Sequence, residues 1–317
     1  MSGTISDPRD EIVSRISLQN CRIRSKPHLI FVCGGKVDAT SINNLSVRNM
    51  FMNRAGEQTE LNFILAESYK DWLAGYDDLS EFESDIAGLS SVVAVILESA
   101  GSLAELGLFY ANEHIRPKLF AVLHREFYNE GSFIKYGILS PLEELDRRFV
   151  LPLDLDPKNI DGIDHKEIAE ILEELTDYVR ELPESEAFLP SNHGHVLLLV
   201  FQIIHLFMAL TISEILEFVR TSGIDMTEKR LKASLYILQR FGLISMEKRS
   251  SQTFFFAKSD APVRVELKGK KGGKRVDIVA SKISVSQFYR LQSKSFRSEK
   301  NRLSVIEKFV ISQEVTE

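Results

Sequence analysis

The segment from Asp85 to Tyr110 constrains the fold of this chain more than any other, because it joins a buried strand to a helix through a single turn. Its run Val92–Leu97 (VVAVIL) is apolar, largely β-branched and short enough for a strand buried on both faces. Gly101 and Ser102 then supply turn residues ahead of a helix-forming segment. We therefore expect a central strand of a parallel sheet, with Glu105 in the first turn of the following helix. That position is the carboxyl edge of the sheet, where open α/β sheets bind ligands.

The first half of the chain alternates short apolar runs with segments of helical character. Apolar runs that end at turn residues predict strands, and the mixed segments between them predict helices. The expected strands are 28–35, 61–65, 92–97 and 118–122, and the expected helices are 46–54, 81–88 and 102–112. This alternation is typical of a parallel sheet with crossover helices, so we assign an α/β, Rossmann-like fold. An α+β domain with an antiparallel edge strand is the alternative.

An amphipathic helix and a linker follow this domain. Residues 164–182 place apolar residues at helical spacing, with acidic residues on the opposite face. This helix could pack on the first domain or mediate self-association, and the sequence does not separate the two. Residues 181–195 contain two prolines and a glycine, which favours a linker. We therefore divide the chain into an N-terminal segment (1–27), a parallel-sheet domain (28–150), the helix and linker (151–190), a second domain (191–260) and a basic extension (261–317).

The second domain is predicted to contain three helices, at 196–210, 213–220 and 227–241, followed by two strands at 243–248 and 253–258. The first helix is an apolar run of 15 residues. It is shorter than the roughly 20 residues that cross a bilayer, so we expect it to be buried in the domain. Three helices and a hairpin in this order are typical of a winged helix-turn-helix. The residues expected to face nucleic acid are Lys229, Lys232, Tyr236 and Arg240 of the third helix and Lys248 and Arg249 of the hairpin.

The net charge of −6 hides a division between the two halves of the chain. Residues 1–190 carry 18 Lys and Arg against 33 Asp and Glu, whereas residues 191–317 carry 21 against 12. A basic half joined to an acidic half suits a protein that meets a polyanion through one part only, although each half could simply have a charged, solvated surface. Phe288, Tyr289 and Phe296 are expected to pack inside the basic half more readily than to stack on bases. The tract 268–275 (KGKKGGKR) is predicted to be a flexible hairpin tip that contacts phosphates through Lys268, Lys270, Lys271, Lys274 and Arg275.

Acidic residues on both sides of the central strand point to sugar chemistry. A carboxylate at the end of a strand can attack the anomeric carbon of a ribosyl group, or stabilise its positive charge as the bond to a base breaks. Glu105 is the candidate for this role, because a helix N-terminus would keep it ionised. Asp85 and Glu98 could bind ribose hydroxyls or handle the proton of the leaving base. Ser102 and Glu105 also match an S-x-x-E capping box, in which the glutamate would only close the first turn of the helix.

Glycines near these acids could admit a ligand. Gly101 and Gly107 flank Glu105 and would let a ligand and a neighbouring strand approach closely. Gly34 and Gly35 end the first strand, so their N–H groups would lie at the same sheet edge and could bind a phosphate. Arg48 is equally consistent with a phosphate ligand and with a surface arginine.

Metal binding and export are not expected. The chain has only Cys21 and Cys33, too few for a four-thiolate zinc site or a disulfide scaffold, and His193-Gly-His195 has too short a spacing for a metal pair. The first residues lack the basic start and apolar core of a signal peptide. A cytoplasmic protein without a resident metal is therefore predicted.

The same residues carry a family resemblance. Phe31-Val-Cys-Gly-Gly35, Glu83-Ser-Asp85 and Glu98-Ser-Ala-Gly-Ser-Leu-Ala-Glu105-Leu-Gly107 resemble the nucleoside 2-deoxyribosyltransferase-like domain over roughly residues 25–150. The resemblance implies that Glu105 is the nucleophile that holds the sugar and that Glu98 assists at the base. This chain has Glu98-Ser-Ala-Gly-Ser where the family usually has Asp-x-Gly-Thr. Related folds cleave the nicotinamide bond of NAD by the same oxocarbenium chemistry. The substrate is then expected to contact Gly34, Gly35, Arg48, Glu83, Gly101 and Ser102.

With a winged helix added, the whole chain resembles the ribosyltransferase and DNA-binding effectors of bacterial retrons, which defend against phage. This resemblance implies two partners, a retron reverse transcriptase and its structured multicopy single-stranded DNA, which restrain or position a toxic activity. It favours an enzyme that cleaves the base–sugar bond of NAD or a nucleotide, which would be a substrate and not a cofactor. The alternative is a noncatalytic, nucleotide-sensing DNA-binding regulator. A nucleoside salvage enzyme would leave the basic half without a purpose. A homo-oligomer is possible, and no membrane partner is expected.

Overall fold

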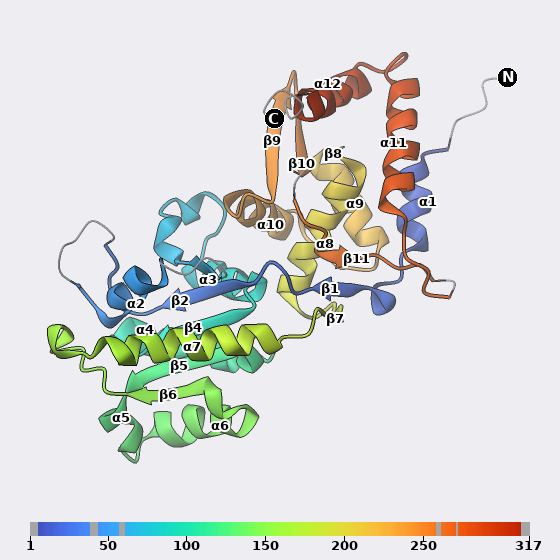
Figure 1. The fold of residues 1–317 in the computed structure, drawn as a ribbon. Helices are drawn as coiled ribbons and strands as arrows, with labels where there is room; N and C mark the ends of the chain where they lie inside the picture. The colour runs from blue at the N-terminus through green and yellow to red at the C-terminus, as the bar shows by residue number, and fades with distance from the viewer. Residues whose placement is uncertain (1–5, 39–43, 57–60, 258–260, 271, 312–317) are drawn as a thin grey trace. The chain divides into compact units, whose positions relative to one another are not determined.

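The chain folds into two compact units, which we describe separately. The computed structural model describes residues 6–38, 44–56, 61–257, 261–270 and 272–311 (Figure 1). The first unit, here called the sheet unit, comprises residues 27–73 and 77–183. The second, here called the basic unit, comprises residues 1–26, 74–76 and 184–317, and it carries 26 Lys and Arg against 17 Asp and Glu.

A five-stranded parallel sheet forms the centre of the sheet unit, in the order β3-β2-β4-β5-β6. The expected α/β class is thereby confirmed, and this sheet has no antiparallel edge. Its strands run as continuous apolar segments because both faces are covered, as β4 illustrates with five buried residues out of five. The strands are β2 (Leu29–Cys33), β3 (Asn62–Ile64), β4 (Val92–Ile96), β5 (Leu119–His124) and β6 (Val150–Leu153).

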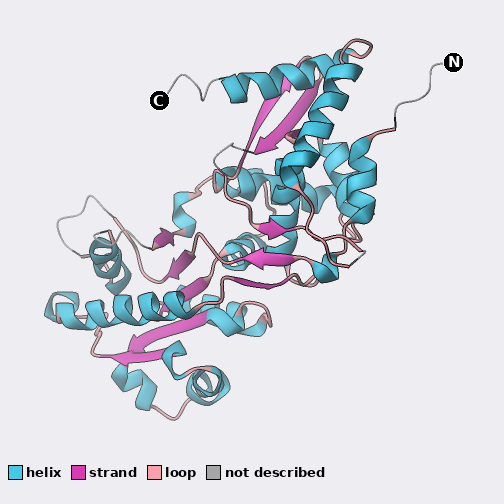
Figure 2. Ribbon diagram, turned by 45° about the vertical axis from the view of Figure 1, so that its right-hand side comes forward, coloured by secondary structure: helices cyan, strands magenta, loops and turns pink. Residues whose placement is uncertain are grey.

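Helices cover both faces of this sheet (Figure 2). The amphipathic helix of the sequence analysis, α7, contacts α2 and belongs to the sheet unit, where its apolar side, from Ile168 to Val179, is buried. A short π-helix at Lys135–Leu139 leads into α6. The helices of the unit are α2 (Val47–Ala55), α3 (Leu79–Leu89), α4 (Ala100–Ala111), α5 (Arg125–Asn129), α6 (Ser140–Leu145) and α7 (His165–Glu181).

The strand order creates a switch point between β2 and β4. The chain passes from β2 outward to β3 and then returns to the other side of β2 to form β4, so the two connections leave the sheet in opposite directions. In open α/β sheets, ligands bind at such a point, beyond the carboxyl ends of the two strands. The glycine turn after β2 and the acidic turn after β4 both lie at this place.

Helix α4 begins earlier than the sequence suggested. Its N-cap is Ser99, whose Oγ accepts a hydrogen bond from Ser102 N at 3.1 Å, while the Ser102 hydroxyl accepts from Ser99 N at 3.1 Å. The capping box is therefore Ser99 with Ser102. The expectation that Glu105 lies in the first turn is wrong, because helix formation starts at Ala100 and places Glu105 in the second turn. The capping explanation for this glutamate is excluded by the same geometry.

The core of the basic unit has the order helix, strand, helix, helix, strand, strand. Strands β8, β10 and β9 pair as an antiparallel sheet in that spatial order. The two-residue strand β8 was not predicted from the sequence, because it is short and its partner, β10, lies about 45 residues further along the chain. The elements are α8 (His193–Phe207), β8 (Ala209–Leu210), α9 (Ile212–Thr221), α10 (Glu228–Arg240), β9 (Ile244–Arg249) and β10 (Gln252–Ala257).

Helix α8 is the apolar run of the sequence analysis, and it is buried from Gly194 to Phe207. Its few polar groups are bonded: Gln202 Oε1 accepts from the backbone of Arg264 and Val265, each at 3.2 Å, and Gln202 Nε2 lies 3.3 Å from His205 Nδ1. A search of the described helices finds none with the length and apolar character that a bilayer crossing requires.

A second antiparallel sheet joins three distant parts of the basic unit. Strand β1 (Arg22–Arg24) lies between β7 (Ser185–Ala187) and β11 (Val265–Glu266). The predicted linker 181–195 is therefore not a plain linker, because it contains a paired strand and the first residues of α8. Three-residue strands whose partners lie more than 160 residues away leave no periodic signal in the sequence, which explains why this sheet was not expected.

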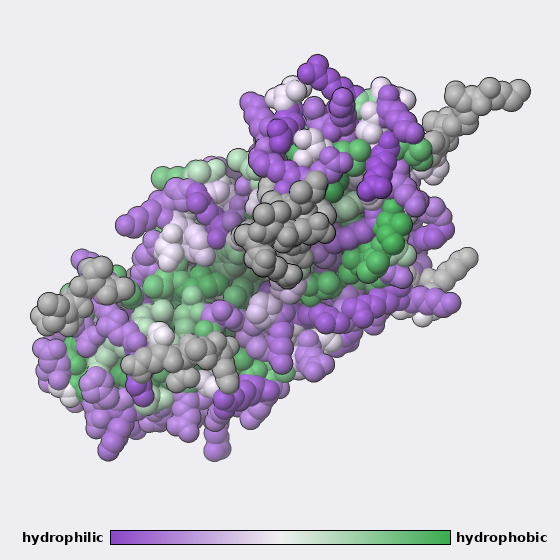
Figure 3. Space-filling model, turned by 45° about the horizontal axis from the view of Figure 1, so that its top comes forward, coloured by the Kyte–Doolittle hydropathy of each residue, from purple (hydrophilic) through white to green (hydrophobic). Residues whose placement is uncertain are grey.

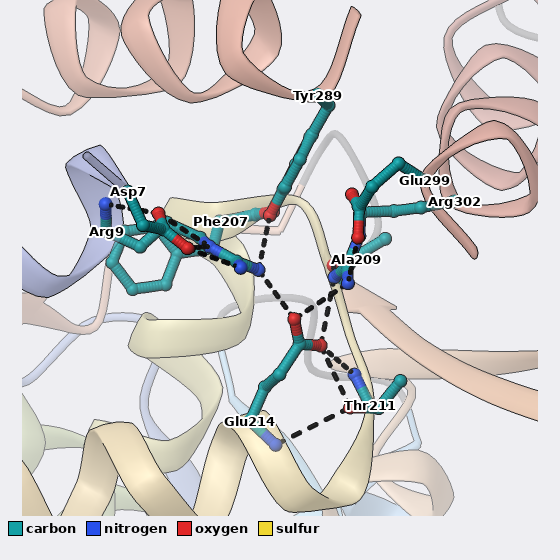
Figure 4. Close-up of polar contacts among 9 residues, drawn as sticks. All are labelled: Asp7, Arg9, Phe207, Ala209, Thr211, Glu214, Tyr289, Glu299 and Arg302. Atoms are coloured by element: carbon teal, nitrogen blue, oxygen red, sulfur yellow. Dashed lines mark hydrogen bonds and ion pairs between the residues drawn. The ribbon is translucent and has the colours of Figure 1, made fainter. Parts of the chain in front are cut away.

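A buried cluster of ion pairs ties the ends of the chain to α9 (Figure 4). Glu214 of α9 accepts from Arg9 of α1 (Pro8–Arg15) at 2.7 Å and from Arg302 of α12 (Arg297–Ile311) at 2.7 and 3.0 Å. Tyr289 of α11 (Ile278–Gln292) donates its hydroxyl to Phe207 O at 3.0 Å and accepts from Arg9 at 3.3 Å. Tyr289 is fully buried, as expected for a packing residue, whereas Phe296 is 56% exposed.

Candidate active site

Glu105 lies in the second turn of α4, beside the carboxyl ends of β2 and β4. Its side chain is partly buried, and Oε2 is buried without a hydrogen-bond partner anywhere in the described part of the chain. An unpaired buried oxygen of this kind costs about 1–3 kcal/mol unless a further group supplies a donor. Burial raises the pKa of Glu105, while the charge of Arg48 lowers it in part. The carboxylate is therefore placed to gain from a donor or a positive charge brought by a ligand.

Glu83 of α3 is the acidic neighbour of Glu105. Its side chain is buried, and this burial, together with the negative charge of Glu105, raises the pKa of Glu83 to about 7. Two carboxyl groups in one electrostatic environment resist double ionisation, so one of them tends to hold a proton. Cys33, at the end of β2, also lies within this environment, and its pKa is raised by burial and by the charges of Glu105 and Glu83. Its thiol is therefore uncharged at neutral pH.

Arg48 is buried under the glycine turn and is not a surface arginine. Its guanidinium donates to Gly35 O at 2.6 Å and Val32 O at 3.2 Å, and it forms an ion pair with Glu67. Burial lowers the pKa of Arg48, which the nearby acidic groups oppose. The guanidinium is thus bonded to two backbone carbonyls and a carboxylate. These bonds hold the turn after β2 and place a positive charge near Glu105.

Glu98 occupies the anion site that the glycine turn was expected to offer to a phosphate. Its Oε1 accepts from Gly35 N at 2.7 Å and Arg48 N at 3.0 Å, and its Oε2 accepts from Val47 N at 2.7 Å. These are the free N–H groups of the turn and of the first turn of α2, a natural place for an anion. Gly35 N–H therefore already has a carboxylate partner within the chain.

Gly34 and Gly35 are required by this packing. A Cβ on Gly35 would lie 2.7 Å from Ser46 Cβ and 2.8 Å from Glu98 Cδ, and Gly34 has a φ of +153°. By contrast, a Cβ on Gly101 would meet only Ser99 Oγ, at 3.7 Å, and one on Gly107 would meet no described atom within 4 Å. No described protein atom therefore requires glycine at these two positions, and the approach of a ligand to Gly101 and Gly107 stays a prediction.

The structure brings Glu83, Glu105, Arg48 and Glu98 together. Asp85 lies on another face of α3, and Ser102 is used in the cap of α4. Asp85 lies two residues after Glu83 on α3, and residues at that spacing do not share a helix face. Asp85 is buried and is not among the groups that shift the pKa of Glu105. Ser102 serves the helix cap, with its Oγ also accepting from Glu98 N at 3.2 Å. Sequence reasoning missed Glu67 and Cys33, which have no motif of their own and reach the site only through the fold.

The predicted nucleic-acid residues of α10 differ in availability. Lys232 is exposed and pairs with Glu228 at 2.6 Å. Tyr236, expected to face outward, packs edge-on against Tyr76 with ring centroids 6.1 Å apart, and Arg240 lies over the Tyr236 ring at 5.2 Å. The segment 74–76 groups with the basic unit, so the outward-facing assignment of Tyr236 is wrong. The remaining predicted contacts of α10 and the hairpin are Lys229, which is exposed, Lys248, which is exposed, and Arg249, which pairs with Glu247 at 3.3 Å.

The two arms of the basic tract 268–275 pair with each other. Lys268 and Arg275 form a β-bridge, Gly269 N donates to Lys274 O at 2.8 Å, and Lys270 N donates to Arg15 O at 2.9 Å. The described arms are thus bonded both to each other and to the end of α1, and the flexibility of the tip stays a prediction. Lys271 lies outside the described residues. His193 and His195 begin α8, and no cluster of three or more His, Cys, Asp or Glu side chains suited to a metal occurs in the described ranges.

Comparison with known proteins places the chain in a family. A family model described as "STM3845 retron effector protein" matches residues 44–246, more than half of the chain. The chain belongs to this retron effector family. The matched region extends from the site of the sheet unit, through α7, α8 and α9, to β9 of the basic unit.

Two curated relatives of this retron effector come from Escherichia coli. The first, named Retron Ec86 putative ribosyltransferase/DNA-binding protein, is 32% identical over 125 residues, which is 38% of this chain and 39% of the relative. The second, named Retron Ec73 putative ribosyltransferase/DNA-binding protein, is 28% identical over 125 residues, 36% of this chain and 38% of the relative. The aligned part of the retron effector thus spans about two-fifths of each relative.

Proposed function

We propose that this retron effector cleaves the bond between base and sugar in NAD or another nucleotide, with Glu105 as the catalytic carboxylate. The observation that carries the proposal is the buried, unpaired Oε2 of Glu105 at the switch point of the sheet. Carboxylates with perturbed pKa values at such a place are typical of functional sites. The names of both relatives include a putative ribosyltransferase, which agrees with chemistry at a ribosyl carbon.

In the proposed reaction, a carboxylate oxygen of Glu105 attacks C1′ of the ribosyl group. The bond from C1′ to the base nitrogen breaks, its electron pair stays on the base, and a glycosyl ester forms on Glu105. Water then attacks C1′, the ester bond breaks with its electron pair returning to Glu105, and the proton of the water passes to a base. The products are the free base and the rest of the substrate with a hydroxyl group at C1′, which is ADP-ribose for NAD and a sugar phosphate for a nucleotide.

Glu83 is the group we assign to the proton transfers. With a pKa of about 7, it is protonated in a large share of molecules at neutral pH and can protonate a leaving purine or pyrimidine. Once deprotonated, it can accept the proton of the attacking water. Nicotinamide leaves NAD⁺ as a neutral molecule and needs no proton in the first step, so the contribution of Glu83 should depend on the leaving group.

Glu98 and Arg48 receive positioning roles in this proposal. Glu98 holds the first turn of α2 against the glycine turn through three backbone N–H groups, and Arg48 holds the turn from below. Asp85, Gly34, Gly35, Gly101 and Ser102 stay predicted substrate neighbours.

For the basic unit we propose nucleic-acid binding. Its surplus of positive charge and the helix and strand order of a winged helix support this, as does the term DNA-binding in the names of both relatives. The partners proposed from family membership are a retron reverse transcriptase and its structured single-stranded DNA, in the cytoplasm.

Release of free base is the direct test. The wild type, Glu105→Gln and Glu113→Gln are each purified with the retron reverse transcriptase and DNA and incubated with NAD and a panel of nucleotides, and nicotinamide and bases are measured by chromatography. Glu113 is an exposed matched control just beyond α4, with a side chain that is 78% exposed. We expect release by the wild type and Glu113→Gln and none above background by Glu105→Gln. The substrate that is consumed identifies the leaving group.

Two other outcomes have definite meanings. Equal release by all three proteins would refute the role of Glu105. No release by any of them, with nucleotide binding and DNA binding intact, would favour the noncatalytic sensor that regulates through DNA.

A further inference from the structure

The basic unit contains a groove outside the winged-helix elements. It measures about 750 Å³ and lies between α1, the hairpin 267–276 and the first turns of α11. Ile12, Val276 and Ala280 provide apolar surface, and Ser14, Ser281 and Ser284 provide hydroxyl groups. Four cations line the same groove, namely Arg15, Lys270, Lys274 and Arg275.

We propose that this groove binds single-stranded nucleic acid, with the four cations on backbone phosphates and the apolar residues against sugars or bases. The inference rests on the nucleic-acid binding proposed above for the basic unit. It places the contact with nucleic acid in this groove and not on α10. It differs from a duplex-binding site, in which base edges are read from a helix in the major groove.

Charge supports a polyanion as the occupant. Two acids also line the groove: Glu11 is paired with Arg15, and Asp277 accepts from Ala280 N as the N-cap of α11. Arg275 lies 3.7 Å from Glu266, so the charge argument rests on the two lysines. The lysines at 270 and 274 have no acidic partner among the described residues, and both are exposed. Backbone phosphates of a nucleic acid suit these two unpaired lysines, which lie on neighbouring arms of one hairpin.

Backbone hydrogen bonds hold the base of the hairpin that lines the groove. Gly272 and Gly273 have φ values of +64° and +59°, the left-handed backbone of a tight hairpin turn. Ser17 N donates to Lys268 O at 2.9 Å, and Asn20 Nδ2 donates to Gly269 O at 3.2 Å, so the base of the hairpin is held by the chain after α1. Cations on a fixed backbone lose less conformational entropy on binding than those on a mobile tip.

The apolar floor favours a single strand over a duplex. A duplex presents phosphates outward and keeps its bases stacked inside, so its backbone gains little from contact with aliphatic side chains. A single strand can turn sugars and bases toward such a surface while its phosphates meet the cations at the rim. Figure 3 shows hydrophilic and hydrophobic residues side by side on the surface of the protein.

The test compares two pairs of lysines in the full chain, one in the groove and one on α10, with a matched control pair in the sheet unit. Binding of a fluorescent 20-nucleotide oligothymidine is measured by anisotropy at several salt concentrations, for the wild type, Lys270→Ala/Lys274→Ala and Lys229→Ala/Lys232→Ala. The control is Lys158→Ala/Lys166→Ala, which removes two exposed lysines of the sheet unit. We expect the groove variant to bind more weakly and the slope of log K against log salt to become shallower by about 1.4, which corresponds to two lost phosphate contacts. The control should keep the wild-type slope.

A second variant and two competitors complete the test. Ser284→Glu adds a negative charge on the exposed side of the groove and should also weaken binding without touching a lysine. Unlabelled oligothymidine should displace the probe better than a hairpin duplex or polyglutamate of equal charge. Equal weakening by both lysine pairs, weakening by the α10 pair alone, or equal competition by polyglutamate would overturn the groove assignment. If the wild type binds neither single strand nor duplex, the proposed nucleic-acid function itself fails. If the wild type binds and the groove variant binds equally well, only the assignment of binding to the groove is rejected.

Discussion

Removing the charge of Glu214 should destabilise the basic unit strongly. This carboxylate receives two arginines whose side chains are only 9% and 3% exposed, and its own side chain is 19% exposed. Burial by itself would raise the pKa of Glu214, but the charge and hydrogen bonds of Arg302, the charge of Arg9 and the Thr211 N–H lower it to about 2. Glu214→Gln keeps the shape and leaves both arginines without their shared anion.

The magnitude follows from the pKa. A shift from 4.5 to about 2, at about 1.4 kcal/mol per unit, corresponds to about 3 kcal/mol of stability at neutral pH. Because the pKa in the folded state is lowered, this stabilisation is fully present above pH 4.5 and is lost as the pH falls toward 2. At pH 3 about 1 kcal/mol should remain, so the difference between wild type and Glu214→Gln should narrow by about 2 kcal/mol between pH 7 and pH 3.

The assay must report on the basic unit alone. Proteins are equilibrated in urea at pH 7 or pH 3, labelled by a short pulse of hydrogen exchange, and analysed through peptides from α8 and α9. Glu217→Gln is the matched control, because Glu217 is an exposed residue of the same helix. A loss below about 1 kcal/mol at pH 7, or a loss that does not change between the two pH values, would refute the reasoning, since the carboxylate would then not be stabilised by the two arginines.

Three further predictions concern the sheet unit. Gly35→Ala should lower the free energy of unfolding by about 1–3 kcal/mol, because the new methyl group collides with Ser46 and Glu98, whereas Gly107→Ala should leave this free energy unchanged or raise it by up to about 1 kcal/mol. Urea unfolding followed by the fluorescence of the single tryptophan, Trp72, measures both variants, and equal effects would contradict the packing argument. Glu98→Ala should leave two backbone N–H groups of the first turn of α2, and one of the glycine turn, without their carboxylate. The hydrogen exchange of Val47–Ala55 should then become faster, and unchanged exchange would contradict the positioning role of Glu98. Release of a purine base should fall as the pH rises above about 7, because Glu83 loses its proton there, and Glu83→Gln should abolish this limb of the pH profile; a limb that persists in the variant belongs to another group.

The sequence was sufficient to predict the parallel sheet because its strands are continuous apolar runs. Val92–Ile96 is buried at every position, and the predicted strand extended only one residue further. The start of α4 was misplaced because Ser99 and Ser102 are both good N-cap residues, and only the backbone shows which of them accepts the hydrogen bond. The shift of the N-cap by three positions, from Ser102 to Ser99, moves Glu105 from the first turn of the helix to the second.

The candidate site was predictable in part. Glu105 and the glycine turn stand out by their place after buried strands, and the structure brings them to the same sheet edge. The partner of the glycine turn was not predictable, because Glu98 meets Val47 and Arg48 across about 50 positions of sequence. Tyr236 fits an outward face of α10 by helical spacing alone, and it is the segment at Tyr76, from far away in the chain, that covers it.

The sheet formed by β1, β7 and β11 makes the chain a nested arrangement, in which the sheet unit is an insertion between two portions of the basic unit. During synthesis the ribosome completes residues 27–183 well before β11 at Val265–Glu266. At about 5–20 residues per second, that interval lasts about 4–16 s. Throughout it, strand β1 lacks its neighbour β11, while the helices that carry the candidate catalytic residues have already been synthesised. The unit proposed to cleave nucleotides can thus fold before the unit proposed to bind nucleic acid is complete. A partner that binds the complete basic unit would then meet a sheet unit that has already folded.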